Sequence, residues 1–257
     1  MRESKKVLVS NRLRKRVFAL NLSSYKDYYL YLTETKEGKK ELPYFIDAVS
    51  TNETYFFRGD NQFVVLQKVI LPELFKKRSK LRVWSAGAST GEEPYSISII
   101  IHETARGRWS GNVEIIATDI SNEVIEKARE GVYSGRTLRF VPREIRGRYF
   151  ESVGKESYRV GEKARKGISF RTHNLLTDNP PGKSFDIIFC RNVMIYFDKP
   201  TQRRLVDGNF ASAIAPDGYL FIGHAESLMG TSKKFGYAQI LKSPIYTRVK
   251  TRHGEEE

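Results

Sequence analysis

The sequence predicts an α/β protein with a doubly wound, mostly parallel sheet, a small helical N-terminal domain and a small antiparallel β insertion. From residue 81 onward, short apolar runs alternate with amphipathic helical patterns, which is typical of a parallel sheet covered by helices. The runs at 113–120 and 185–193 are nearly continuously apolar, as strands buried on both faces are. Residues 132–167 are too many for a plain crossover and carry short alternating runs with glycine turns. This segment is therefore the predicted insertion.

The first 50 residues are predicted to be helical, and the main domain is expected to cover 51–257. A helix is expected over 7–21, where four apolar residues recur at helical spacing: Val9, Leu13, Val17 and Leu20. Three basic side chains of this helix are expected to face away from that stripe: Arg12, Lys15 and Arg16. A second helix, over 23–34, is expected to be capped by Ser23 or Ser24 and to bury its tyrosines. A third is expected over 42–51.

The main domain is predicted to contain five strands of one sheet, at 81–87, 113–120, 168–175, 185–193 and 218–224. The intervening helices are expected at 92–106, 122–130 and 199–214. The closing stretch, 237–250, has the pattern of an antiparallel pair at the sheet edge.

The composition limits the class of protein. The chain has 257 residues, of which 40% are hydrophobic, so it is long enough to bury a substantial core. No apolar run approaches the roughly 20 residues of a membrane helix, and we expect neither membrane insertion nor a secretion signal. A single cysteine, Cys190, excludes an internal disulfide and favours the cytoplasm. The four histidines are dispersed without metal-ligand spacing, and no metal is expected.

The net charge of +14 is concentrated in two segments. Residues 1–16 carry seven Lys or Arg against one acid, and residues 131–171 carry eleven against four. Clustered charge of this kind favours an acidic or polyanionic partner, whereas scattered charge would only favour solubility.

The loop "SAGASTGEEP", residues 85–94, lies between the first predicted strand and its helix, where open parallel sheets bind ligands. Glu92 and Glu93 stand where a phosphate would otherwise dock, and they would repel a pyrophosphate. A cationic adenosine compound without phosphate suits this loop. S-adenosylmethionine is the common cofactor of that description.

Asp119 ends the second predicted strand, where an acid is placed to accept the two ribose hydroxyls of a nucleoside. The alternative is that Asp119 caps the helix beginning near Ser121 and that Glu92 and Glu93 only complement a helix dipole. The loop and the acid together favour the cofactor site. In "GHAES", His224 and Glu226 fit either acid–base chemistry or a structural hydrogen bond at a strand end.

Six motifs in order resemble the CheR-type chemotaxis protein methyltransferases, from about Asn11 to the last strand. They are "NETYFFR" (52–58), "VWSAGASTGEEPYS" (83–96), "ATDI" (117–120), "HNLL" (173–176), "FDIIFCRNVMIYFD" (185–198) and "APDGYLFIGHAESL" (215–228). The resemblance implies a Rossmann-like class I methyltransferase fold. It also implies methyl transfer from S-adenosylmethionine to glutamate side chains of chemoreceptors, giving methyl esters and S-adenosylhomocysteine.

The resemblance assigns cofactor contacts to residues that match the motifs: Asn52, Thr54, Arg58, Gly87, Glu93, Asp119, Asn174, Leu175, Arg191 and Asn192. Glu92 stays a rival to Glu93, because pattern alone does not separate adjacent acids. Tyr196 is expected close to the reacting methyl group. Arg58 or Arg191 is a candidate clamp for the acceptor carboxylate, because arginine holds carboxylates in a fixed fork.

A glutamate nucleophile is already ionised at neutral pH, so no general base is required. The partner implied by the resemblance is an acidic helical bundle of a chemoreceptor, with Arg12, Lys15 and Arg16 as the candidate docking face. Residues 1–50 resemble a shortened form of the family's helical domain, without its usual first helix. Residues 132–167 resemble a β subdomain that grips a receptor tail peptide in some members. This copy is short, so tail-peptide docking is not expected.

Two other functions remain open at this level. An RNA methyltransferase would use the same fold and charge. However, "RNVMIYF" (191–197) lacks the Pro-Pro run of many amine and base methyltransferases, and nucleic acid is not expected as a partner. A non-catalytic module that binds the cofactor and signals by protein contact is the second alternative. We expect a monomer.

Overall fold

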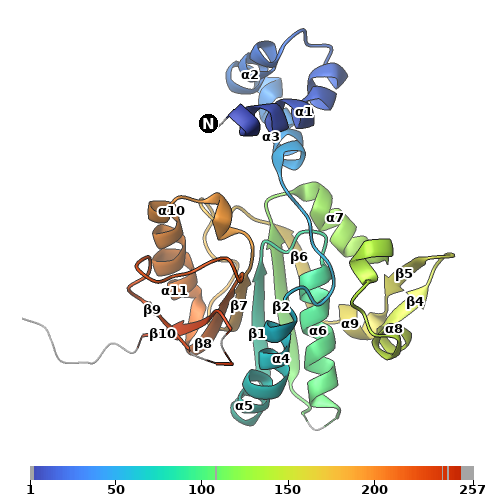
Figure 1. Ribbon diagram of the computed structural model, residues 1–257, viewed down its shortest axis with the longest axis vertical. Coiled ribbons are helices and arrows are strands. Elements are labelled where there is room, and N and C mark those ends of the chain that lie inside the picture. The colour runs from blue at the N-terminus through green and yellow to red at the C-terminus, as the bar shows by residue number, and fades with distance from the viewer. Residues whose placement is uncertain (1–2, 108, 239, 242, 250–257) are drawn as a thin grey trace, which may run out of the picture.

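The structure is a computed structural model that describes residues 3–107, 109–238, 240–241 and 243–249 (Figure 1). Three helices precede the main body: α1 (Glu3–Ala19), α2 (Tyr25–Glu34) and α3 (Lys36–Val49). In Figure 1 they stand apart from the sheet, and the chain descends from α3 to the main body as a single extended segment. No described helix is both long enough and apolar enough to cross a membrane.

The N-terminal helices differ from the prediction at two points. The third helix begins at Lys36 rather than near residue 42, because the Thr35 hydroxyl caps it by accepting the N–H of Gly38 at 2.9 Å. Ser24, one of the two expected caps, does cap α2. Of the tyrosines of α2, Tyr28 is buried, whereas Tyr25 and Tyr29 are exposed, so the expectation of a tyrosine-lined buried face was only partly correct.

Two of the three basic residues expected to face away from the core are instead held by intramolecular contacts. Arg12 donates from Nη1 to the carbonyls of Val49 (2.6 Å) and Ser50 (3.0 Å), so it ties α1 to the end of α3. Arg16 pairs with the buried Glu41 at 2.7 Å. Only Lys15 is exposed without a recorded partner in the described chain. The prediction for Arg12 and Arg16 was wrong because their partners lie on another helix.

The main sheet has seven strands in the order β6-β2-β1-β7-β8-β10-β9. The parallel strands are β1 (Lys80–Ala86), β2 (Asn112–Asp119), β6 (Ile168–Thr172), β7 (Phe185–Cys190) and β8 (Ile214–Ile222). Strands β9 (Phe235–Tyr237) and β10 (Ile245–Arg248) add the expected antiparallel edge, although residues 239, 242 and 250 of that predicted stretch lie outside the described residues. Because β2 and β6 follow β1 on one side, and β7 and β8 lie on the other, strand order reverses between β1 and β7.

Helices cover both faces of this sheet, as the buried strands require. One face packs on α6 (Glu92–Ala105), and the opposite face packs on the segment formed by α10 (Lys199–Arg204), a π-helical turn (Leu205–Phe210) and α11 (Ala211–Ala213). Alternate residues of β1 illustrate the two layers. Val83 packs with the α6 layer and Trp84 with the opposite one, and both are fully buried. Helix α7 (Asn122–Glu130) packs beside β2 and β6.

Residues 60–77, to which no element was assigned from the sequence, form a helical segment that completes the α6 layer. It consists of α4 (Asp60–Val65), a π-helical turn (Leu66–Ile70) and α5 (Leu71–Lys77). Its buried residues include Phe63, Leu66 and Leu74, which pack in the same cluster as Val83.

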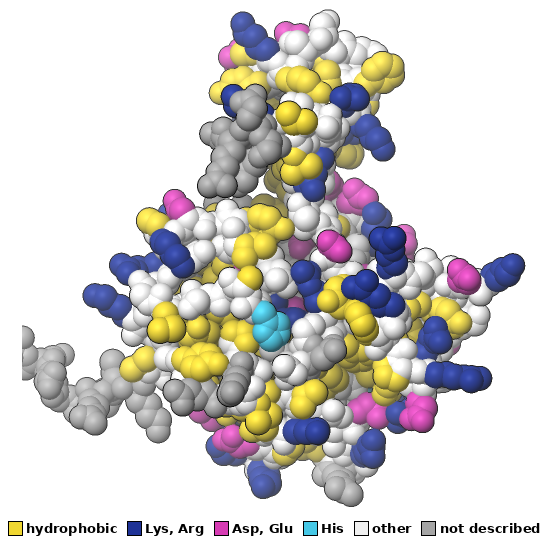
Figure 2. Space-filling view, in the orientation of Figure 1, with side chains coloured by type: hydrophobic (Ala, Val, Ile, Leu, Met, Phe, Trp, Pro, Cys, Tyr) yellow, Lys and Arg dark blue, Asp and Glu magenta, His cyan; other side chains and the backbone are white. Residues whose placement is uncertain are grey.

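The insertion has the expected antiparallel sheet, in the order β3-β5-β4. Its strands are β3 (Val132–Ser134), β4 (Phe150–Ser152) and β5 (Ser157–Val160). The expectation of a largely β segment was incomplete, because a 3-10 turn (Gly135–Leu138) and α8 (Arg143–Tyr149) lie between β3 and β4, and α9 (Glu162–Arg165) follows β5. Figure 2 shows Lys and Arg side chains gathered around the insertion, at the right of the view.

Candidate active site

A pocket of about 440 Å³ opens at the carboxyl ends of the parallel strands, beside the point where strand order reverses. Its volume lies within the range of small-molecule sites. Tyr196 lines it, and so do all the cofactor residues assigned from the motifs: Asn52, Thr54, Arg58, Gly87, Glu93, Asp119, Asn174, Leu175, Arg191 and Asn192. The structure therefore gathers five of the six motifs around one cavity, and only the motif at 215–228 contributes no lining residue. The end of α3 also contributes to the wall, through Val49 and Ser50.

The glycine loop after β1 brings backbone close to the pocket. Gly87 has φ +87°, and a Cβ at this position would collide with the side chain of Val193. The N–H groups of Gly87 and Ala88 donate to the Thr118 carbonyl at 2.8 and 2.9 Å, so the loop is tied to the end of β2. Ser89 follows with φ +50°. This backbone path leaves the pocket side of the loop free of side-chain atoms at Gly87.

Asp119 lies at the pocket and is held by two backbone N–H donors. Its Oδ2 accepts from the Ser89 N–H at 2.9 Å and its Oδ1 from the Ser121 N–H at 3.1 Å. Burial raises the pKa of the Asp119 carboxyl, and the two backbone donors oppose this shift. The cap of α7 is the Ser121 hydroxyl, which accepts from the Val124 N–H at 3.3 Å. Asp119 therefore orders the two loops and is not itself the cap.

Glu93 lines the pocket and is held by two partners. Its Oε1 accepts from the Ser85 hydroxyl at 2.7 Å, and its Oε2 lies 3.2 Å from Nη1 of Arg191. Burial raises the pKa of the Glu93 carboxyl, and the charge of Arg191 opposes that shift. Arg191 is buried as well, donates from Nη2 to the Arg58 carbonyl, and has no recorded partner for its Nε.

Glu92 differs from its neighbour. Its side chain is buried away from the pocket, where its Oε2 accepts from the Thr90 hydroxyl at 2.7 Å. Burial raises the pKa of the Glu92 carboxyl. Of the two adjacent acids, the geometry thus places only Glu93 at the cavity.

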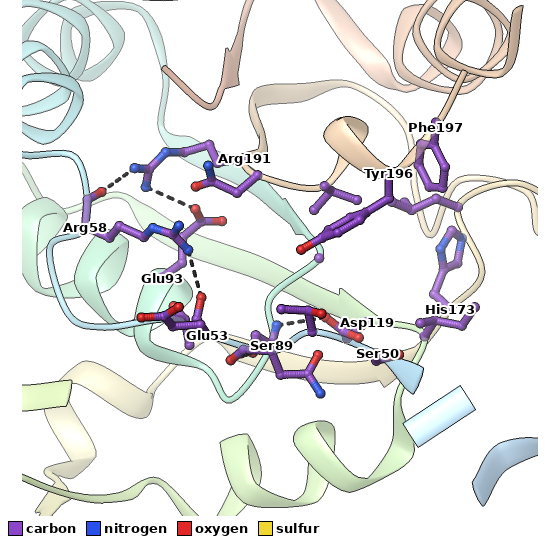
Figure 3. Close-up of a pocket in the computed structure, with 18 of the residues that line it drawn as sticks. Ser50, Glu53, Arg58, Ser89, Glu93, Asp119, His173, Arg191, Tyr196 and Phe197 are labelled. Atoms are coloured by element: carbon purple, nitrogen blue, oxygen red, sulfur yellow. Dashed lines mark hydrogen bonds and ion pairs between the residues drawn. The ribbon is translucent and has the colours of Figure 1, made fainter. Parts of the chain in front are cut away.

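Arg58 and Tyr196 stand at opposite sides of the pocket (Figure 3). Arg58 donates from Nη1 to the Glu53 carbonyl at 2.8 Å, and its other guanidinium N–H groups have no recorded partner in the described chain. Tyr196 belongs to a 3-10 turn (Met194–Tyr196) after β7, and its side chain is 61% exposed. In Figure 3 its ring points into the cavity, whereas Arg191 and Glu93 lie behind Arg58. Arg58 is therefore the accessible guanidinium of the two candidate clamps.

The loop that carries Tyr196 is held by Glu226, a residue to which the sequence assigned no definite role. The Glu226 carboxylate accepts three backbone N–H groups, from Gly223 (2.5 Å), Asn192 (3.0 Å) and Ile195 (3.2 Å). Asn192 itself has φ +59°. Of the two alternatives for "GHAES", the structure supports the structural hydrogen bond for Glu226, while His224 is exposed.

Three further residues were missed by sequence reasoning. Ser85 and Ser89 lie within the glycine-loop motif, where they contact Glu93 and Asp119, respectively. Serine is common in loops, so its presence in the sequence did not indicate these contacts. His173 starts the "HNLL" motif and lines the pocket, with its Nε2 2.9 Å from the Asn179 carbonyl. Because a carbonyl only accepts, Nε2 carries the proton.

The charges of the pocket suit a zwitterionic ligand with an additional positive charge. Glu93 and Asp119 supply negative charge inside, and Arg58 supplies an unneutralised guanidinium at the edge. In the glycine loop the N–H groups of Gly87, Ala88 and Ser89 are already bound, to the Thr118 carbonyl and to Asp119, so these three are not available to a phosphate. The residues present therefore fit S-adenosylmethionine, whose sulfonium is cationic and whose methionine end carries a carboxylate. No cluster of metal-ligating side chains is found among the described residues.

The comparisons with known proteins agree with this site. The family model described as "CheR methyltransferase, all-alpha domain" matches residues 1–50, and "CheR methyltransferase, SAM binding domain" matches residues 52–243. The chemotaxis protein methyltransferase of Borreliella burgdorferi is 39% identical over 235 residues, covering 89% of this chain and 82% of the relative. Chemotaxis protein methyltransferase 2 of Pseudomonas aeruginosa is 42% identical over 236 residues, covering 90% and 81%.

The corresponding protein of Escherichia coli is 38% identical over 242 residues, covering 91% of this chain and 80% of the relative. Together with the family models, these matches extend over both the helical region and the sheet that forms the pocket. The chain therefore belongs to the CheR methyltransferase family and is an S-adenosylmethionine-dependent methyltransferase of chemotaxis.

Proposed function

We propose that the chain methylates glutamate carboxylates of chemoreceptors, forming glutamate methyl esters and S-adenosylhomocysteine. The observation that carries this proposal is the unneutralised guanidinium of Arg58 at the edge of the pocket, in a site whose buried acids are both committed to other groups. A site of this kind offers an anchor for an anion. A glutamate carboxylate suits it, because it is anionic and ionised at neutral pH.

The cofactor would be held by groups around the whole pocket. Asp119 accepts the ribose hydroxyls, and Asn174 and Leu175 contact the adenine. Gly87 allows the backbone of the loop after β1 to approach the cofactor closely. Asn52 and Thr54 close the pocket from the segment that follows α3. Glu93, Arg191 and Asn192 form the wall near the methionine end. The geometry supports these assignments, because all of these residues line the same cavity.

The acceptor carboxylate would meet Arg58 and Tyr196. Arg58 holds it in a bidentate fork, because its guanidinium N–H groups other than the Nη1 donor to Glu53 are free in the described chain. The same side chain also contacts the methionine end of the cofactor. Arg191 does not serve as the clamp, since it is buried and already bound to Glu93 and to the Arg58 carbonyl. Tyr196 donates a hydrogen bond from its hydroxyl and orients the acceptor oxygen.

Catalysis then consists of placement and desolvation. Alignment of one carboxylate oxygen with a methyl carbon converts a bimolecular reaction into an intramolecular one, which can supply roughly 7–11 kcal/mol of the barrier. The cofactor supplies the methyl group. Arg58 supplies the positive charge that holds the acceptor carboxylate, and Tyr196 orients the attacking oxygen. We further propose that the chain acts as a monomer in the cytoplasm, where the receptor's acidic helical bundle lies.

The test is transfer of labelled methyl from S-adenosylmethionine to a chemoreceptor cytoplasmic fragment, with bulk RNA as a parallel acceptor. Mild alkali then separates esters, which are hydrolysed, from methylated bases and amines. Base-labile label on the receptor alone is expected. Label on RNA, or tight cofactor binding without transfer to either acceptor, would replace this proposal by one of the two alternatives.

A further inference from the structure

From the edge of the pocket, where Tyr55 and Arg58 lie, a stack of four side chains leads to the insertion. Arg58 lies over the ring of Tyr55 with its Cζ 5.7 Å from the ring centroid, and Arg139 lies over the same ring at 4.5 Å. Arg139 is also 4.6 Å from the ring centroid of Phe140, whose ring lies 5.2 Å from that of Tyr55. We call these four residues the arginine–aromatic stack.

The backbone that carries Arg139 is fixed to the motif that carries Arg58. The N–H of Phe56 donates to the Thr137 carbonyl at 3.0 Å, which joins "NETYFFR" to the turn before Arg139. On either side of Arg139 and Phe140, Leu138 and Val141 are buried in one cluster with Phe56. The two arginines are therefore held at a set separation by a packed core.

Arg139 is positioned but not neutralised. Its side chain is exposed, and it has neither an ion pair nor a side-chain hydrogen bond within the described parts of the chain. Arg136 and Arg143, which flank it, are exposed and without ion pairs there as well. Arg148, another exposed arginine of the insertion, is by contrast paired with Glu103 at 2.8 Å. A guanidinium held by two rings loses little conformational freedom when it binds an anion, so Arg139 is preorganised for one.

We propose that Arg139 binds a second carboxylate of the receptor, from an acidic residue about one helical turn from the glutamate that enters the pocket. This inference rests on the proposed function and specifies how the acceptor is recognised. Both guanidiniums lie over one ring, so their separation is at most the sum of the two distances given above. Carboxylates one turn apart on a helix are about 5.4 Å apart along its axis, which lies within this upper limit.

The chemistry favours a carboxylate pair on a helix over a nucleic acid strand. Arginine forks bind phosphate as well as carboxylate, so charge alone does not decide. However, the chain is a methyltransferase of chemotaxis, which favours a receptor carboxylate over an RNA phosphate as the partner. The two arginines thus select a partner that offers one carboxylate to the pocket and another beside it.

The experiment measures steady-state methyl transfer by the full chain to a chemoreceptor cytoplasmic fragment. Arg139→Gln is compared with Arg159→Gln, which removes an equally exposed and unpaired charge from β5 of the same insertion. Arg139→Gln is expected to raise the KM for receptor about fivefold at low ionic strength. It is expected to leave kcat and the cofactor KM unchanged, and Arg159→Gln should change the KM for receptor less than twofold.

A double-mutant cycle identifies the receptor acid. Acidic residues next to a methylated glutamate are replaced by glutamine one at a time, and each fragment is tested with both forms of the enzyme. One acid, about one helical turn from the methylated glutamate, is expected to be the partner of Arg139. Once that acid is replaced, Arg139→Gln is expected to cause no further rise in the KM for receptor. An unchanged KM for receptor in Arg139→Gln, or equal effects for every acid, overturns the inference while leaving the proposed function intact. Absence of transfer by the unaltered chain, or transfer to RNA, overturns both.

Discussion

The Nη1 of Arg191 lies 3.2 Å from the Oε2 of Glu93 at the wall of the pocket, where Arg191 is buried and the Glu93 side chain is 13% exposed. Burial lowers the pKa of Arg191 and raises that of Glu93, but the attraction between them opposes both shifts. The pair is completed by the Ser85 hydroxyl and the Arg58 carbonyl. A buried pair of this kind contributes geometry more than stability, since its desolvation offsets much of its attraction. Here it fixes the backbone carbonyl of Arg58, whose side chain lies at the pocket edge.

Glu93→Gln is expected to lower both stability and cofactor affinity. The substitution leaves Arg191 buried without a counter-charge, and breaking such a pair costs about 3 kcal/mol of unfolding free energy. Urea unfolding of the free protein and calorimetric titration with S-adenosylmethionine measure the two effects. If Glu93→Gln unfolds and binds like the unaltered chain, the pair has no role in shaping the pocket.

Glu92→Gln is the matched variant, and it is expected to leave cofactor affinity unchanged, because Glu92 lies outside the pocket. Burial raises the pKa of Glu92 in the folded protein above its unfolded value. Its contribution to stability is therefore fully present below the unfolded pKa, near 4.3, and is lost as pH rises through the folded pKa. Glu92→Gln removes this part of the pH dependence. Between the unfolded and the folded pKa of Glu92, the stability of the Glu92→Gln variant relative to the unaltered chain therefore rises with pH. Urea unfolding across acid and neutral pH measures it, and a relative stability that falls with pH would contradict this prediction.

Asp119→Asn is expected to weaken cofactor binding at least about tenfold, because an amide accepts fewer hydrogen bonds than a carboxylate and carries no charge. The amide would also turn an NH₂ group toward one of the two backbone donors, Ser89 or Ser121. Calorimetric titration is the measurement. Asp198→Asn, at the exposed cap of α10, serves as control and should bind normally. Equal dissociation constants for both variants would remove Asp119 from the cofactor site.

Glu226→Gln is expected to lower kcat about tenfold, with a smaller effect on cofactor affinity. An amide offers one acceptor oxygen instead of two, so at least one N–H among Gly223, Asn192 and Ile195 loses its partner. The turn that holds Tyr196 then moves. Glu226 is thus expected to act as a positioning residue. A fall in kcat that exceeds the change in the dissociation constant for S-adenosylmethionine supports this role, whereas a merely structural residue would change both to a similar extent. His224→Gln, its exposed neighbour, should keep kcat, and an equal loss in both variants would refute the assignment.

The sequence predicted the parallel strands well because most of them are apolar runs, as β1, β2 and β7 are. The helical segment over residues 60–77 was missed for a physical reason. Its π-helical turn (Leu66–Ile70) shifts the helical period, and Pro72 together with several valines weakens the helical signal. The buried residues Phe63, Leu66, Ile70 and Leu74 are nevertheless three or four residues apart, so the helical spacing itself was present in the sequence.

The pocket residues were predictable as a set, because the motifs end strands that converge at one edge. Their partners were not, since each comes from a distant part of the chain. Glu226 lies 34 residues from Asn192, and Arg12 lies 37 residues from Val49. Periodicity reports only which face a side chain occupies, and it carries no information on tertiary partners.

The basic face of α1 is expected to divide into one docking residue and two structural ones. Lys15 is exposed without a recorded partner in the described chain, so Lys15→Glu should raise the KM for receptor about threefold at low salt and leave stability unchanged. Arg16→Glu should instead reduce the unfolding free energy by about 3 kcal/mol, because it places a second acid beside the buried Glu41. Receptor titrations at two salt concentrations and urea unfolding of both variants measure these effects. If Lys15→Glu left the KM for receptor unchanged, the acidic bundle would not dock on α1, and the basic insertion around Arg139 would be the receptor-binding surface that remains.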